Sequence, residues 1–335
     1  MRAIIKWLFI ATLGQALSFT AQAEGWNPEP FSVRNFNPFI LLHGLPVATS
    51  SGILEERESS LELLSSLANN SMERISDNEQ VTLDGETYRL ALIWKRGLGD
   101  GWQLGVEAPF LSHRHGVMDN LIENWHDLLG LSNSERDDWP RNRLRYLHKI
   151  DGEYDVLIED DVSGFGDLQL LLSRRLRQDS AGIRVSMHAS LKLPTGDSDS
   201  LLGSGATDLA VWLSGSDAEL LKRWPVGGFF QAGLLYMGHA EVLREQQRNL
   251  ALFGSLGLSW RAYDWLDLKL QVDGHTSFYH SDLDQLGGPA VMFTFGGSIL
   301  FDDGPGRIDI SLGENLTTDP VPDLIVNLAY KTSFP

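Results

Sequence analysis

The chain has 335 residues, a formal net charge of −18 and no cysteine. Its acidity argues against a nucleic-acid partner, and without cysteine no disulfide can staple the fold. The length exceeds that of an ordinary single-core globular domain, a limit that does not apply to a closed barrel whose outer face is covered by lipid.

The first 23 residues predict a cleaved secretory signal peptide. Arg2 and Lys6 precede an apolar run over residues 7–13, and Ala21-Gln22-Ala23 forms a small-x-small cleavage site. No later segment has the eighteen or so consecutive apolar residues that a membrane-spanning helix needs. An exported chain of this kind is periplasmic, secreted or an outer-membrane barrel.

Residues 24–57 are expected to be irregular. They carry prolines at positions 28, 30, 38 and 46, a density that excludes a central strand. We expect a plug-like segment on the periplasmic side that folds into the mouth of a barrel. A disordered leader fits the same composition.

Residues 58–335 alternate between apolar and polar side chains. Leu266, Leu268 and Leu270 alternate with Asp267 and Lys269, and twelve stretches share this period of two. They cover residues 59–72, 86–97, 101–113, 164–177, 181–194, 205–215, 226–239, 248–262, 265–279, 289–301, 305–315 and 322–334. In a membrane barrel the apolar row would face lipid, and the charged row would face a water-filled lumen. The sequence therefore predicts an all-β fold, a transmembrane antiparallel β-barrel of about twelve strands.

The same alternation assigns side chains to the lumen. The predicted lumen-lining residues are Arg89, Lys95, Glu107, His113, His115, Arg184, His188, Lys192, Lys269, Asp273, His275 and Lys331. In the outward row of residues 265–279 we place Leu266, Leu268, Leu270, Val272 and Phe278. Histidines beside a carboxylate could bind metal or act as a base, but lumen histidines in a charge network are the commoner arrangement.

Loop lengths orient the predicted barrel. Short turns alternate with longer loops, as in outer-membrane barrels, whose short turns lie in the periplasm. An even number of strands then places both termini in the periplasm. Aromatic side chains at the short-turn ends of the strands predict an interfacial girdle, formed by Trp94, Trp102, Trp260, Phe301 and Phe334.

The longest loop, residues 114–163, is predicted to hold a helix at 117–129 and then a charged, strand-poor stretch. Leu121, Ile122, Trp125 and Leu128 share the apolar face of this helix. The opposite face is acidic, which disfavours the phosphate-rich outer leaflet. We expect the helix to constrict the extracellular mouth; a lid packed on neighbouring loops is the alternative.

Three aspartates follow glycine-rich motifs at the loop ends of neighbouring predicted strands. Glycines there allow sharp turns, and Asp167, Asp197 and Asp208 can accept hydrogen bonds from turn amides. The alternative is that the three carboxylates converge and bind Ca²⁺ through hard oxygen ligands. No other cofactor is expected.

No serine lies in a recognisable nucleophile motif. We therefore expect no enzymatic activity, with a lipid-directed hydrolase and a structural envelope protein without transport as alternatives.

Several motifs resemble a known group of proteins. The chain resembles outer-membrane barrels associated with the phenol meta-degradation pathway and, more closely, a related Gram-negative family of uncharacterised function. The motifs are Gly164-Phe165-Gly166-Asp167, residues 191–197, residues 202–205 with Thr207-Asp208, residues 34–38, residues 43–46 and residues 125–131. The resemblance implies a narrow passage or binding tunnel for small molecules, apolar ones included.

The predicted location is the outer membrane of a Gram-negative bacterium. Expected partners are outer-membrane lipid and lipopolysaccharide, a small-molecule ligand, and the barrel-assembly machinery. The last expectation comes from the C-terminal strand, which resembles the insertion signal of such barrels, although Pro335 follows the aromatic Phe334 that usually ends the chain.

Overall fold

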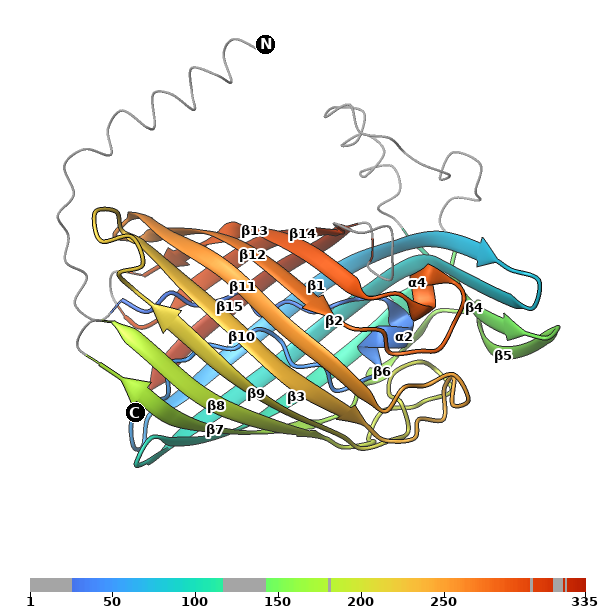
Figure 1. The fold of residues 1–335 in the computed structure, drawn as a ribbon, viewed down its shortest axis with the longest axis horizontal. Helices are drawn as coiled ribbons and strands as arrows, with labels where there is room; N and C mark the ends of the chain where they lie inside the picture. Colours follow the sequence, from blue (N-terminus) through green and yellow to red (C-terminus); the bar gives the residue numbers. More distant parts are fainter. Residues whose placement is uncertain (1–25, 117–142, 180–181, 302–303, 316–321, 323) are drawn as a thin grey trace, which may run out of the picture.

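Twelve strands close into an antiparallel barrel in the computed structural model, which describes residues 26–116, 143–179, 182–301, 304–315, 322 and 324–335 (Figure 1). The strands are β1 (Ser59–Ile75), β2 (Glu79–Gly99), β3 (Trp102–Arg114), β7 (Gln169–Gln178), β8 (Ile183–Lys192), β9 (Asp208–Asp217), β10 (Val226–Met237), β11 (Leu250–Tyr263), β12 (Leu266–His275), β13 (Ala290–Leu300), β14 (Arg307–Asn315) and β15 (Leu324–Phe334). β1 pairs with β15 from Ser59↔Phe334 to Asn69↔Leu324, which closes the ring. The predicted fold is confirmed.

Burial alternates along the strands as predicted. On β12, Asp267, Lys269 and Gln271 are buried, whereas Leu268 and Leu270 are 40% and 51% exposed. The exposed row faces outward, so the barrel presents an apolar outer surface and a polar inner wall. None of the described helices is long and apolar enough to cross a membrane.

The two ends of the barrel differ. Short connections join β2 to β3, β7 to β8, β11 to β12 and β13 to β14, and the C-terminus lies at the same end, which we call the turn end (Figure 1). Longer connections gather at the opposite end, which we call the loop end. In the β2–β3 turn, Gly99, Asp100 and Gly101 all have positive φ, which explains the glycines there.

The strand predicted at 164–177 is interrupted. β3 pairs first with β6 (Val162–Phe165) and then with β7, and Gly166–Leu168 between them form no ladder. This break lets Asp167 turn into the lumen, where it is 6% exposed.

A hairpin of β4 (Arg145–Ile150) and β5 (Glu153–Ile158) corrects the prediction of a strand-poor stretch. β4 pairs with the outer part of β2, from Glu79 to Asp84, and extends the sheet beyond the barrel at the loop end. Tyr146, Leu147 and His148 are at most 1% exposed. Because consecutive residues are buried, this strand shows no alternation in the sequence.

The connection after β12 contains a second correction. Phe278 was predicted in the outward row, but β12 ends at His275 and Phe278 is fully buried. The chain turns inward there and continues to the short helix α4 (Asp284–Gly287), so the alternation of the strand no longer applies.

Residues 26–57, which we call the inserted segment, lie inside the barrel as far as Leu54, and the exposed residues 55–57 lead back to β1 (Figure 1). They run from the turn end toward the loop end, form the single-turn helix α2 (Pro38–Leu41) and return to β1. Burying irregular backbone requires partners for its amides, and proline removes a donor at four positions. Side chains of the barrel wall supply many of the remaining hydrogen bonds.

An apolar core surrounds α2 at the loop end. Phe39 and Ile40 pack among buried side chains of the wall and the loops, including Trp212, Phe253 and Phe278. A second cluster joins Phe31, Val33, Phe36 and Leu41 to Leu111, Leu202, Met292 and Ile325. The lumen is therefore filled with apolar side chains at the loop end rather than being wet throughout.

Candidate functional site: a chamber inside the barrel

A chamber of about 460 Å³ lies between the inserted segment and the barrel wall, toward the turn end. Residues 46–55 of the segment form one side, and the inner faces of β1, β2, β3 and β7 form the other. The wall contributes Glu62, Ile93, Lys95, Gln103, Glu107, Gln169, Leu171 and Ser173. The two limbs of the inserted segment therefore share the turn-end half of the lumen with the chamber, and the tip of the segment packs into the loop-end half.

Side-chain amides hold the inserted segment against the wall. Gln271 accepts a hydrogen bond from the backbone N–H of Phe31 (2.9 Å) and donates to its carbonyl (3.3 Å). Gln231 and Gln103 accept from the N–H groups of Thr49 and Leu54 at 3.0 and 3.1 Å. These side-chain hydrogen bonds satisfy backbone groups that a neighbouring strand would satisfy in a sheet, although the segment forms no strand.

Hydroxyl groups secure the return limb of the segment. The hydroxyls of Ser51 and Ser216 on β9 are 2.7 Å apart, and Ser186 on β8 donates to the Ser51 carbonyl at 2.7 Å. All three serines are at most 5% exposed.

One carboxylate joins the segment to the wall through two arginines. Arg34 of the segment donates to Glu107 on β3 at 2.8 Å, and Arg89 on β2 donates to the same carboxylate. All three residues are at most 5% exposed. The second arginine leaves this buried group with one surplus positive charge.

A second charge network binds the start of the segment. Arg307 on β14 bridges Glu29 and Asp309, and Lys331 on β15 lies 3.4 Å from Glu62 and 3.3 Å from Asp309. Burial raises the pKa of Glu29, but attraction to Arg307 and Lys331 outweighs it, and the pKa falls from 4.5 to about 2.

The charged side chains that line the chamber, four cations and five carboxylates, belong to a wider network of ion pairs. Among the described residues, the charged side chains that line it or connect to those through ion pairs are eight cations and six carboxylates. The cations are Arg34, Arg89, Lys95, Arg175, Arg184, Lys269, Arg307 and Lys331; the carboxylates are Glu29, Glu55, Glu58, Glu62, Glu107 and Asp309.

The glycine-rich motifs anchor the tip of the segment. Gly44 donates its backbone N–H to Asp208 at 2.8 Å, and a Cβ at this position would lie 3.1 Å from the Cβ atoms of both Asp208 and Lys192. Asp167 accepts from the backbone N–H groups of Thr195 and Gly196 at 2.9 and 2.8 Å. These hydrogen bonds support the interpretation that the aspartates of the motifs stabilise turns.

The three predicted calcium ligands do not converge. The ammonium of Lys192 pairs with both Asp167 and Asp208, where it supplies the positive charge that a cation would bring. Asp197 is exposed and binds Ser200 and the Asp199 N–H within its own turn. In the described ranges no group of three or more His, Cys, Asp or Glu side chains could hold a metal ion.

Three of the predicted lumen histidines are buried, with hydroxyl, amide and carbonyl groups as hydrogen-bond partners. His113 contacts Thr87 and the Leu201 carbonyl, and His275 contacts Asn35. His188 lies between the hydroxyls of Ser173 (2.8 Å) and Ser214 (2.7 Å) and stacks on Trp212. These contacts place no carboxylate on His188, so they do not build a serine–histidine–acid triad.

His115 corrects the prediction. β3 ends at Arg114, so the alternation that assigned His115 to the lumen no longer holds. Its side chain is 62% exposed and contacts Asp161 at 2.7 Å. The other predicted lumen residues point inward: Arg89, Lys95, Glu107, His113, Arg184, His188, Lys192, Lys269, Asp273, His275 and Lys331.

The predicted constriction helix at 117–129, with Leu121, Ile122, Trp125 and Leu128, lies outside the described residues, as does the predicted signal peptide. Sequence reasoning missed what does fill the loop end, namely α2 and its core. The apolar run Phe39-Ile40-Leu41-Leu42 was the available sign.

A charged cluster fixes the β4–β5 hairpin at the loop end. His148 contacts Glu79 on β2 (3.0 Å) and Asp155 on β5 (3.2 Å) through its two ring nitrogens. Gln246 and Ser281 also donate to Glu79. Burial lowers the pKa of His148, but the hydrogen bonds to Asp155 and Glu79 raise it more, so the net direction is upward.

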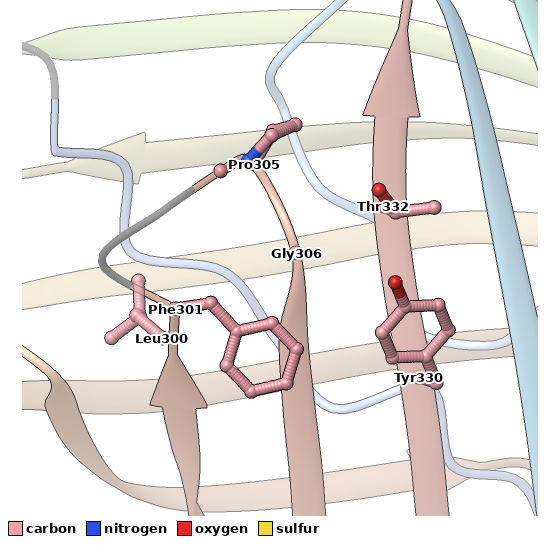
Figure 2. Close-up of a pocket in the computed structure, with 7 residues that line it drawn as sticks. Leu300, Phe301, Pro305, Gly306, Tyr330 and Thr332 are labelled. Atoms are coloured by element: carbon pink, nitrogen blue, oxygen red, sulfur yellow. The ribbon is translucent and has the colours of Figure 1, made fainter.

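The outer face carries a hollow at the turn end (Figure 2). Phe301 after β13 and Tyr330 on β15 line it, with ring centroids 6.3 Å apart, and Pro305 lies on the turn beside them. Both rings are partly exposed, at 41% and 43%. Aromatic side chains at this level suit the boundary between membrane and water.

Comparisons with known proteins agree with this architecture. Residues 4–334 match the model of a family described as "Protein of unknown function (DUF3187)". A search of curated proteins finds no match. Among solved structures, the chain is similar to the COG4313 outer membrane channel from Pseudomonas putida F1, with 13% identity, a TM-score of 0.51 and coverage of 84% of this chain and 97% of that one.

Two porins are more distant. The NanC porin and the KdgM porin are each 8% identical, with TM-scores of 0.45 and 0.43, and each match covers 82% of this chain and 99% of the other. At 13% identity, the similarity to the Pseudomonas putida F1 channel shows a shared barrel fold.

Proposed function

The chain belongs to the family described as protein of unknown function (DUF3187), and from this premise we propose that it is an outer-membrane barrel that provides a narrow passage or binding tunnel for small molecules. The apolar outer face and the aromatic side chains at the turn end support a membrane location. The similar structure from Pseudomonas putida F1 is described as an outer membrane channel, which supports the same role.

The observation that carries the proposal is the chamber beneath the inserted segment. A barrel with a purely structural role would need no internal space, whereas here about 460 Å³ lies against polar and charged side chains. The core around α2 closes the loop end, so passage through the barrel requires the tip of the segment to move.

The short turns then lie in the periplasm, together with the C-terminus and the start of the inserted segment. This orientation follows the general arrangement of outer-membrane barrels. It places the chamber on the periplasmic side of the closed core.

Single-channel recording in planar bilayers tests the proposal. The full mature chain is compared with a variant in which residues 26–54 are replaced by a short Gly-Ser linker, which leaves all twelve strands in place. We expect discrete conductance, larger in the deletion variant. Two variants that insert as heat-modifiable barrels and never conduct would contradict the proposal.

A further inference from the structure

Lys95 is an ammonium that lines the chamber and is attracted by Glu62, Glu29 and Glu107 from beyond the distance of a direct ion pair. It projects inward from β2, where it is paired in register with Ser60 on β1 and Gly105 on β3. Among the described residues no carboxylate oxygen lies within the 4.0 Å of an ion pair with its Nζ. An ammonium that faces a cavity and makes no direct ion pair can donate charge-assisted hydrogen bonds to an anion placed there.

The acids of the chamber are engaged elsewhere. Glu107 is shared by Arg34 and Arg89, Glu62 pairs with Lys331, and Glu29 pairs with Arg307. These pairings reduce the repulsion that an incoming anion would meet.

Two acids lie nearer the mouth of the chamber. Glu55 pairs with Arg175 at 2.6 Å, and Glu58 accepts from the backbone N–H of Glu55. With these two included, the eight cations and six carboxylates still leave two surplus positive charges, in a chain whose net charge is −18. The surplus belongs to this wider ion-pair network, because the lining side chains alone are four cations and five carboxylates.

Apolar side chains flank Lys95. Ile93 on β2, Leu171 on β7 and Ile53 of the inserted segment line the same space. Gly105 keeps it open, because a Cβ there would lie 3.0 Å from Cγ of Lys95 and 3.6 Å from Cβ of Leu171. The Gln103 carbonyl is occupied by the Leu54 N–H, which leaves its amide hydrogens to donate.

We propose that the chamber binds a small organic carboxylate, with its charged group on Lys95 and its apolar body against Ile93 and Leu171. This inference names a substrate class for the proposed passage and so rests on it. The carboxylate is matched by the ammonium and the Gln103 amide, and the flanking aliphatic side chains accept an apolar body that inorganic anions lack.

Binding is measured by ¹⁹F NMR titration of the full mature chain in detergent, with 4-fluorobenzoate as the probe and 4-fluorobenzyl alcohol as its neutral analogue. We expect the acid to bind at least tenfold more tightly than the alcohol. Lys95→Gln removes this preference and Lys95→Arg keeps it. The matched control, Lys149→Gln on the loop-end hairpin, leaves both affinities unchanged, because its ammonium lies over the Tyr154 ring.

Equal affinity for acid and alcohol, or an unchanged preference in Lys95→Gln, would overturn the inference. Because this titration needs no conductance, it separates the two proposals. Acid binding without conductance contradicts the passage and supports the site. Conductance with no acid preference in binding supports the passage and contradicts the site.

Discussion

Arg34 of the inserted segment donates to Glu107 of β3 across 2.8 Å, and neither side chain exposes more than 4% of its surface. Arg89 shares the same carboxylate from β2. The Glu107 carboxylate therefore joins the inserted segment to the barrel wall. It also compensates part of the positive charge of the two buried guanidinium groups.

Glu107→Gln should loosen this attachment. The substitution leaves two buried guanidinium groups without their counter-charge, and breaking a buried pair in this way costs about 3–5 kcal/mol. We expect a lower urea midpoint for the protein folded in lipid vesicles, and faster proteolysis of residues 26–57. The control Glu153→Gln, at the exposed tip of the β4–β5 hairpin, should match the parent chain. Equal loss of stability in both variants would refute the role given to Glu107.

Leu270→Arg tests the outward row. Leu270 is 51% exposed on β12, and a charge on the lipid face costs about 2–4 kcal/mol near the bilayer midplane. We expect a reduced yield of heat-modifiable protein on folding from detergent into lipid. Leu157→Arg, at a position 45% exposed on the hairpin beyond the barrel, should insert normally. If both variants insert alike, the face assigned to lipid is incorrect.

The ion pair of Glu29 with Arg307 should make the start of the segment acid-sensitive. The pKa of Glu29 is about 2 in the folded chain, below its ordinary 4.5, so its stabilising contribution is present above pH 4.5 and is lost between about pH 4.5 and 2. Protection factors for amide hydrogen exchange near residues 26–32, referred to the intrinsic rate at each pH, should fall over that range. In Glu29→Gln these protection factors should be low at every pH. Protection in the parent chain that does not fall between pH 4.5 and 2 would rule out this coupling.

His148 should respond in the opposite direction. Its pKa is raised above 6.5 by Asp155 and Glu79, so the contribution of the protonated ring is complete below that value and is lost as pH rises through the folded pKa. Limited proteolysis of the β4–β5 hairpin should therefore increase with alkaline pH. In His148→Gln the hairpin should be cleaved readily throughout. A cleavage rate that does not change with pH in the parent chain would show that the contacts of His148 with Glu79 and Asp155 do not hold the hairpin in place.

The strands were predictable wherever one face meets lipid and the other meets the lumen. On β12 that contrast gives Leu268 and Leu270 outward and Lys269 inward, as the structure has them. Alternation fails where both faces are buried or where the strand has ended. Tyr146 to His148 show the first case, and His115 and Phe278 show the second.

The chamber was not predictable, although the inward direction of four side chains that line it, Lys95, Glu107, Arg184 and Lys331, was. Its boundary is the inserted segment, whose path depends on side chains such as Gln271 and Gln231 bonding an irregular backbone. No periodicity encodes such a path. The charge surplus likewise appears only when pairs distant in sequence, such as Glu29 with Arg307, are seen together.

Site-directed cross-linking tests most directly whether the segment lies in the lumen. The hydroxyls of Ser51 and Ser216 are 2.7 Å apart and the chain has no cysteine, so Ser51→Cys with Ser216→Cys introduces a single candidate pair. In outer-membrane preparations, mild oxidation should join them in nearly all molecules, whereas Ser51→Cys with Ser259→Cys on β11 should stay reduced. Failure of the first pair to cross-link in a fully inserted barrel, or equal cross-linking of both pairs, would contradict the inserted segment on which the account depends.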